Sequence, residues 1–126
     1  MKKVITANNA PAAVGPYSQA IEAGGTLYIS GQLPVDPTTN SVPTTIEEQT
    51  LQSLKNIEAI LSEAGYKRSD VVKSTVLLDS MDDFAAMNKT YAEFYSEPFP
   101  ARVCYEVAKL PLGVKVEIET IAIKEL

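Results

Sequence analysis

The 126-residue chain contains no histidine and a single cysteine, Cys104. Without histidine, a Ser-His-Asp or Cys-His nucleophile, histidine general acid–base catalysis and histidine-ligated metals are excluded. One cysteine cannot form an internal disulfide, a C-x-x-C redox pair or a thiolate zinc site. An enzyme built from this chain must therefore work with arginine, glutamate, tyrosine, serine, asparagine, backbone groups and water, and we expect neither a metal nor another cofactor.

Long apolar runs are also missing, since none approaches the ~18 residues that a membrane span needs. The start of the chain, Lys2 to Ile5, lacks the apolar region of a signal peptide, which predicts a cytoplasmic location and no membrane partner. No glycine spacing matches a dinucleotide or phosphate loop. The net charge of −5 repels phosphate backbones and argues against a nucleic-acid partner.

The length and the composition, 45% hydrophobic and 21% charged, predict one globular domain over residues 1–126. Two stretches have the spacing of amphipathic helices. The first follows Thr44 or Thr45, each with a glutamate three residues later as in a capping box, and runs to Gly65, a C-cap signal. The second begins after Ser80 and ends before Pro98. Alternating or β-branched runs predict strands at 2–6, 19–23, 26–33, 71–78, 101–107 and 116–123, with Gly24-Gly25 as a hairpin turn.

The resulting order, βββαβαββ, predicts an α+β sandwich in which both helices cover one face of a mixed sheet. Several strands keep apolar side chains on both faces, among them 76–78 and 121–123. We therefore expect another subunit to bury the helix-free face.

Arg102 is the residue that most needs an explanation, because it lies inside an apolar, strand-like run. Side chains alternate along a strand, so Arg102 shares a face with Cys104 and Glu106, whereas Val103 and Tyr105 lie on the other, which we expect to be the core face. A guanidinium group does not lose its charge, and a half-buried one needs a carboxylate from the protein or from a ligand.

A second alternating run places Glu117 and Glu119 on one strand face. From these residues alone, a structural ion pair between Arg102 and Glu117 and a substrate site at Arg102 both stay open. Gly31, near the end of a strand, is either a bulge or a point where a ligand approaches the backbone.

Five short motifs together resemble one family. They are Gly15-Pro16-Tyr17-Ser18, Ile29-Ser30-Gly31-Gln32, Asn88 before Tyr91, Pro100-Ala101-Arg102 and Val116-Glu117-Ile118-Glu119. In this order, from Ala10 almost to the C-terminus, they are similar to the signature of the reactive-intermediate deaminases, also called the RidA or YjgF family. The resemblance implies a chorismate-mutase-like fold and a homotrimer with a central β-barrel and ligand clefts between subunits.

The resemblance also implies an activity, the hydrolysis of 2-iminobutanoate or 2-iminopropanoate to a 2-oxo acid and ammonia. Arg102 would hold the substrate carboxylate, Glu117 would orient the attacking water, and the backbone at Cys104 would help to place it. Cys104 itself is expected to be a small buried side chain rather than a nucleophile. Tyr17, Ser30, Gly31 and Asn88 correspond to residues that line the family's cleft.

Three alternatives remain open at this point. The same residues suit a regulatory protein that binds 2-oxo acids without turnover. Ribonuclease activity or inhibition of translation is sometimes ascribed to members of this family, but the acidic charge and the lack of histidine make it unattractive here. A chaperone-like protein that uses exposed apolar surface is the third.

Overall fold

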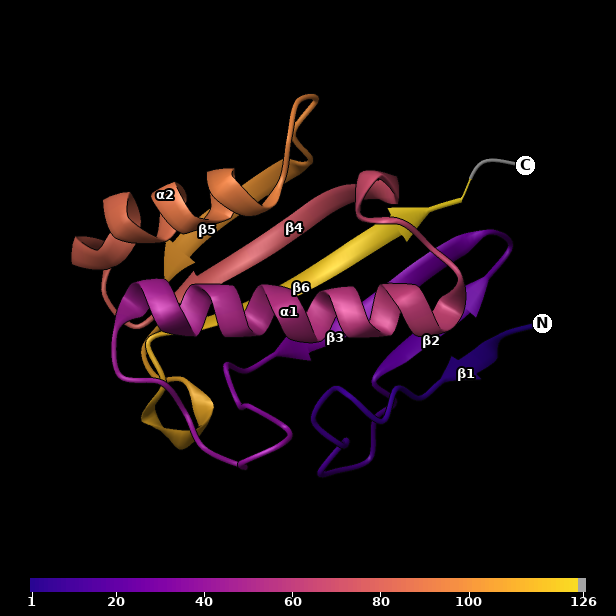
Figure 1. Ribbon diagram of the computed structural model, residues 1–126, viewed down its shortest axis with the longest axis horizontal. Helices are drawn as coiled ribbons and strands as arrows, with labels where there is room; N and C mark the ends of the chain where they lie inside the picture. Colours follow the sequence, from indigo (N-terminus) through magenta and orange to yellow (C-terminus); the bar gives the residue numbers. More distant parts are fainter. Residues whose placement is uncertain (125–126) are drawn as a thin grey trace.

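The computed structural model describes residues 1–124 and places a six-stranded sheet under two helices. The elements in chain order are β1 (Lys3–Ile5), β2 (Ala20–Ala23), β3 (Thr26–Gln32), α1 (Ile46–Ala64), β4 (Val71–Leu78), α2 (Phe84–Phe94), β5 (Ala101–Glu106) and β6 (Val116–Ile123) (Figure 1). The predicted order βββαβαββ and the α+β class are confirmed. The predicted single domain over residues 1–126 stays a prediction.

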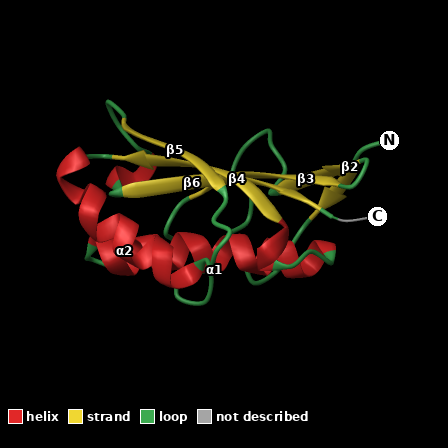
Figure 2. Ribbon diagram, turned by 90° about the horizontal axis from the view of Figure 1, so that it is seen from above, coloured by secondary structure: helices red, strands yellow, loops and turns green. Residues whose placement is uncertain are grey.

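The strands lie in the order β1-β2-β3-β6-β4-β5. The pair β4 and β5 is parallel, because α2 forms the crossover between them, and the other neighbours are antiparallel. Both helices cover the same face of this mixed sheet, and within residues 1–124 the opposite face carries no helix (Figure 2). β5 forms one edge of this sheet.

The ends of α1 follow from its capping residues. The Thr45 side chain accepts a hydrogen bond from the Glu48 backbone N–H at 3.1 Å, so the second of the two predicted capping pairs is the one used. Gly65 ends the helix with φ 79°, a left-handed conformation that glycine adopts without steric cost. The chain thus sets both boundaries of α1 locally. Within residues 1–124, neither helix has the length and apolarity of a membrane span.

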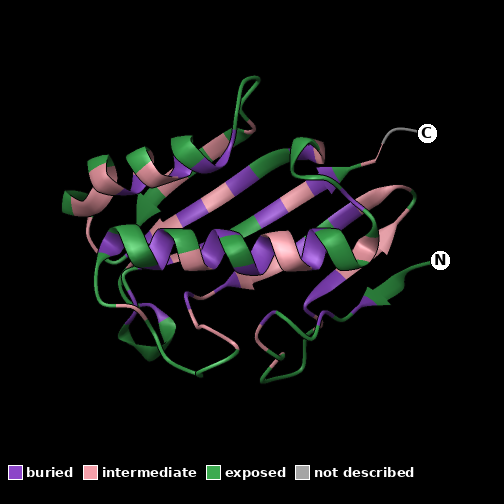
Figure 3. Ribbon diagram, viewed as in Figure 1, coloured by how far each residue is buried: buried purple, intermediate pink, exposed green. Residues whose placement is uncertain are grey.

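The core lies between the helices and the sheet, where the inner face of each helix is buried (Figure 3). Its largest fully buried side chains include Leu54 and Ile57 from α1, Met87 from α2, and Val76 and Ile118 from the central strands. Burying such side chains contributes roughly 1.5–3 kcal/mol each before conformational entropy is subtracted. This packing fixes the sheet face that each strand residue occupies.

One prediction about faces is wrong for the single chain. Val103 and Tyr105 on β5, expected on the core face, are 43% and 49% exposed. Arg102 and Cys104 lie on the side of the sheet that α2 covers, and Cys104 packs against the core. The alternation itself is as predicted, but α2 packs on the other face of the strand from the one expected.

Candidate active site

The candidate residues form two groups on opposite faces of the sheet. In the strand register, Arg102 pairs with Ser74, and Ser74 pairs with Thr120, so this row faces the helices. Glu117 pairs with Leu77, and Leu77 pairs with Tyr105, so this row faces away from them. Arg102 and Glu117 of one chain therefore cannot meet, and an ion pair between them within a single chain is excluded.

The Arg102 side chain packs against apolar and aromatic side chains of α2. Its guanidinium carbon is 4.9 Å from the ring centre of Tyr91 and 5.7 Å from that of Phe84. One guanidinium nitrogen lies 3.9 Å from the sulfur of Met87. Within residues 1–124 the guanidinium has no carboxylate within 4 Å and no oxygen acceptor, so its positive charge is available for an anion from outside the chain.

Asn88 lies on α2 beside Met87 and three residues before Tyr91. Its side-chain oxygen is buried and has no hydrogen-bond partner among the described residues. The hydroxyl group of Tyr91 is in the same condition, and burial raises the pKa of that phenol. Unsatisfied polar groups of this kind cost free energy. Both lie on α2, the helix against which the Arg102 guanidinium packs, and they suggest a place for a polar ligand there.

Cys104 follows Arg102 on the same strand face and is half-buried. Burial raises the pKa of its thiol, an effect that the nearby charge of Arg102 partly offsets. The thiol is therefore protonated at neutral pH and is a poor nucleophile, as expected from the sequence.

Glu117 and Gly31 form the centre of the second group, on the helix-free face. The ladder between β3 and β6 shifts register between Ile29 and Gln32, which agrees with a bulge, one of the two interpretations of Gly31 left open by the sequence. A Cβ atom at Gly31 would overlap the carboxyl group of Glu117. A side chain at residue 31 would therefore displace the Glu117 carboxylate from the position that it occupies beside Gly31.

A cleft of about 900 Å³ opens beside Glu117, and we call it the Glu117 cleft. Its lining includes Tyr17, Ser30, Gly31, Leu112, Glu117 and Glu119. Burial and the negative charge of Glu119 both raise the pKa of Glu117. Such a carboxylate takes up a proton more readily than an exposed glutamate does, which suits a group that accepts a proton from water.

Three buried amides hold the loops around this cleft, and the sequence analysis did not identify them. Gln19 accepts a hydrogen bond from the Ala7 N–H at 2.6 Å and donates to the Pro11 carbonyl at 2.7 Å. Asn56 donates to the Leu33 carbonyl at 3.1 Å, and the Gln49 side chain accepts a bond from the backbone of the loop before β6. Two of the three lie on the buried stripe of α1, where a polar residue in an apolar pattern is a usable signal.

The Ser30 hydroxyl donates to the Ser18 carbonyl at 2.6 Å, which ties β3 to the segment that carries Tyr17. The Tyr17 ring is half-exposed, and its hydroxyl group accepts a bond from the Val14 N–H at 3.4 Å. Of the predicted binding residues, Tyr17, Ser30 and Gly31 therefore gather with Glu117, whereas Asn88 lies with Arg102. Within residues 1–124 no cluster of three metal-ligating side chains is present.

Comparisons with known proteins identify the family and the fold of the chain. The sequence profile of the family described as Endoribonuclease L-PSP matches residues 7–124. The chain belongs to this family. A RutC family protein of Pyrococcus horikoshii is 56% identical over 99% of this chain and all of its own length. A 2-iminobutanoate/2-iminopropanoate deaminase of Escherichia coli is 49% identical, with 98% of this chain and 99% of that protein aligned. The recognition made from the five motifs is thereby confirmed.

The fold is shared as well as the sequence. The crystal structure of the YjgF gene product from E. coli superposes with a TM-score of 0.94 at 48% identity, covering 98% of this chain and 99% of that one. The predicted YjgF-type sandwich is confirmed for the single chain. The trimer and its central barrel stay predictions, because one chain is described.

Proposed function

We propose that this protein hydrolyses reactive 2-imino acids, such as 2-iminobutanoate and 2-iminopropanoate, to 2-oxo acids and ammonia. The observation that carries the proposal is Arg102, a half-buried cation that has no anion of its own within residues 1–124. Close similarity to a protein named for this activity supports it.

In the proposed complex, Arg102 holds the carboxylate of the imino acid through two parallel, charge-assisted hydrogen bonds. The rings of Tyr91 and Phe84 lie beside the guanidinium group and attract its positive charge. Asn88 offers a polar group beside the bound substrate. Tyr17, Ser30 and Gly31 shape the other side of the site.

Glu117 is the proposed water-positioning group. Water adds to C2 of the iminium, R–C(=NH₂⁺)–COO⁻, forming the new C–O bond while the C=N pair of electrons moves to nitrogen. Glu117 takes one proton from this water and gives it to the amine nitrogen of the adduct. The C–N bond then breaks and the nitrogen leaves as ammonia, while the hydroxyl proton passes to Glu117 as the C=O bond of the 2-oxo acid forms. General acid–base assistance of this kind contributes ~10²–10⁴-fold. The backbone at Cys104 helps to place the water, and its thiol takes no part.

Arg102 and Glu117 lie on opposite faces of the sheet, so in this proposal two subunits supply one site. Arg102, Cys104 and Asn88 come from one subunit and the Glu117 cleft comes from its neighbour. The helix-free face offers apolar surface for such an assembly: Tyr28, Val103, Tyr105 and Ile123 are each more than 40% exposed. We propose a homotrimer with these faces turned inward to a central barrel. A stable monomer in sedimentation at micromolar concentration would contradict this assembly.

The proposed partners are a small 2-imino or 2-oxo acid and further copies of the chain, with no nucleic acid, membrane or cofactor, and the proposed location is the cytoplasm. The family description names an endoribonuclease. The net charge of −5 and the absence of histidine do not favour RNA cleavage by this chain. Cleavage of RNA that Arg102→Ala abolishes would revive that function, whereas cleavage that persists in the variant points to contamination.

The decisive experiment is a coupled assay in which a serine or threonine dehydratase generates the imine and the rate of 2-oxo acid formation is followed. We expect acceleration by the wild type, and little or none by Arg102→Ala or Glu117→Gln with the oligomer intact. The exposed substitution Glu93→Gln on α2 is the control and should keep full activity. No acceleration above spontaneous hydrolysis by the wild type would refute deaminase function and favour a regulatory protein that binds 2-oxo acids.

A further inference from the structure

The turn between β5 and β6 holds an exposed leucine in an unfavourable backbone conformation. Leu112 has φ 59° and ψ 11°, a left-handed conformation that costs free energy for a residue with a branched side chain. The side chain is 74% exposed, so burial in the core of its own chain does not offset this cost. Residues held in such conformations are concentrated at functional sites.

The turn has a fixed position because both of its sides are anchored. Leu110 before it and Val114 after it are 3% and 1% exposed. The Lys115 N–H donates to the Gln49 side-chain oxygen at 2.8 Å, which ties the end of the turn to α1. The strained tip is therefore held between two buried residues and projects from the molecule at a defined place.

That place is the wall of the Glu117 cleft. Leu112 lines the cleft together with Val14, Leu33 and Val35, which give it apolar surface. The same cleft contains the carboxyl group of Glu117. A substrate whose reacting carbon lies at Glu117 would therefore find both a polar end and an apolar wall within one cleft.

We infer that Leu112 contacts the side chain of the substrate and gives the enzyme a preference for 2-imino acids whose apolar side chains are longer than the methyl group of 2-iminopropanoate. The inference rests on the proposed function, because it assigns the substrate's side chain to the cleft in which Glu117 places water. Burying one methylene group against Leu112 favours binding about fourfold. The preference should grow with side-chain length.

The kinetic test uses imines that an amino-acid oxidase produces from alanine and from leucine. We expect the ratio of kcat/KM for the leucine-derived imine to that for the alanine-derived imine to fall about tenfold or more in Leu112→Gly. Leu112→Met, which restores an apolar side chain, should recover most of the ratio. Leu51→Ala, which removes a partly exposed leucine from the outer face of α1, is the matched control and should leave it unchanged.

A stability measurement separates this role from a structural one. Glycine adopts the left-handed conformation without strain, so Leu112→Gly should keep its thermal midpoint while losing the preference. A substantial fall in the midpoint, accompanied by equal losses of kcat/KM for both imines, would mean that Leu112 supports the fold, and would overturn the inference.

Binding of the 2-oxo acids tests the inference whether or not the protein turns over imines. By calorimetry or NMR titration, we expect affinity to rise from pyruvate to 4-methyl-2-oxopentanoate in the wild type and to stay level in Leu112→Gly. An equal rise in both proteins, or no binding of either acid, would overturn the inference. Turnover by the wild type with an unchanged ratio in Leu112→Gly would overturn it too, but would leave the proposed deaminase in place.

Discussion

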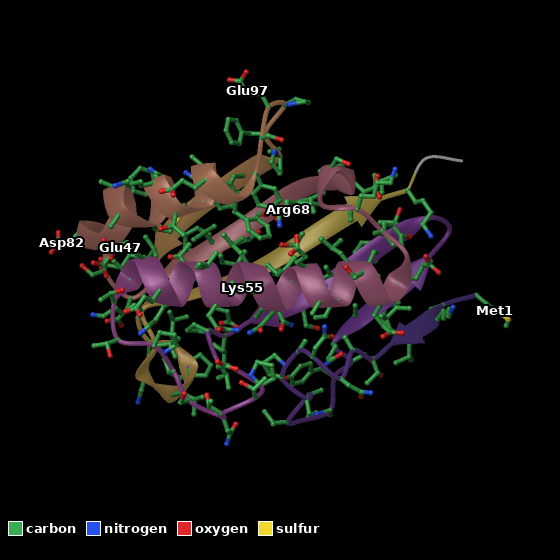
Figure 4. The ribbon with its side chains drawn as sticks, in the orientation of Figure 1. Met1, Glu47, Lys55, Arg68, Asp82 and Glu97 are labelled. Carbon is green, nitrogen blue, oxygen red and sulfur yellow. The ribbon has the colours of Figure 1, made fainter. Side chains whose placement is uncertain are left out.

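Arg68 and Arg102 both lie against aromatic side chains of α2, but their surroundings differ. Arg68, labelled in Figure 4, stacks at 3.7 Å on Phe94, pairs with Glu58 of α1 and donates to the Phe94 carbonyl at 2.7 Å. Arg102 lies beside the rings of Phe84 and Tyr91, but its guanidinium group has no oxygen acceptor within residues 1–124. Arg68 is thus satisfied by its own chain and joins α1 to α2, whereas within the same residues Arg102 donates only to the Met87 sulfur, at 3.9 Å.

The contrast predicts opposite effects for the same substitution at the two arginines. Arg102→Ala should lower kcat/KM roughly 10²–10³-fold, because it removes two charge-assisted hydrogen bonds to the substrate, with little change in the thermal midpoint. Arg68→Ala should keep activity within about threefold and lose about 1 kcal/mol of stability, since exposed ion pairs and stacked cations contribute modestly. Steady-state kinetics and thermal denaturation of both variants test these predictions. Full activity in Arg102→Ala would show that Arg102 does not bind the substrate.

Gly31→Ala tests the other half of the site without touching Arg102. The new methyl group overlaps the Glu117 carboxyl group and must displace it, so we expect kcat to fall roughly 10–100-fold while the fold is retained. Gly15→Ala is the matched control, because a Cβ atom there meets only the Tyr17 ring, at 3.5 Å. If Gly31→Ala and Gly15→Ala give the same kcat, the position of Glu117 does not limit the reaction.

Glu119→Gln should change the pH profile rather than the maximal rate. Glu117 accepts a proton from water only when it is ionised, so activity is lost as the pH falls through its raised pKa. Removing the negative charge of Glu119 favours ionisation, which should shift the acid limb of kcat/KM to lower pH. Glu93→Gln, on the exposed face of α2, should leave the limb where it is. A shift of the limb to higher pH would contradict the assignment of Glu117.

Cys104→Ala should have the smallest effect, with activity within about threefold of the wild type. Burial raises the pKa of the thiol, and the proposed contribution at this position comes from the backbone, which alanine retains. Kinetics combined with sedimentation check both activity and assembly. Loss of all activity in an intact oligomer would show that the Cys104 thiol takes part in the reaction.

The local features of the fold could be predicted from the sequence because each depends on neighbouring residues. Thr45 and Gly65 bound α1, and Gly24-Gly25, with φ 56° and 79°, makes the hairpin turn between β2 and β3. Helical and strand periodicity placed every helix and strand within a few residues of its observed position. The motifs around Arg102 and Glu117 identified the family, because they specify residue types in a fixed order.

Tertiary structure alone decided which strand face became the core and which site residues meet. Alternation divides β5 into two sets of side chains, but the packing of α2 determines that Arg102, and not Val103, faces the helices. The same packing places Arg102 and Glu117 on opposite faces of the sheet, so they cannot pair within one chain. In the proposed assembly, the two residues instead reach one site from two subunits. Periodicity is a property of the local backbone, whereas a face, a neighbour across the sheet or the strained tip at Leu112 depends on segments that are distant along the chain.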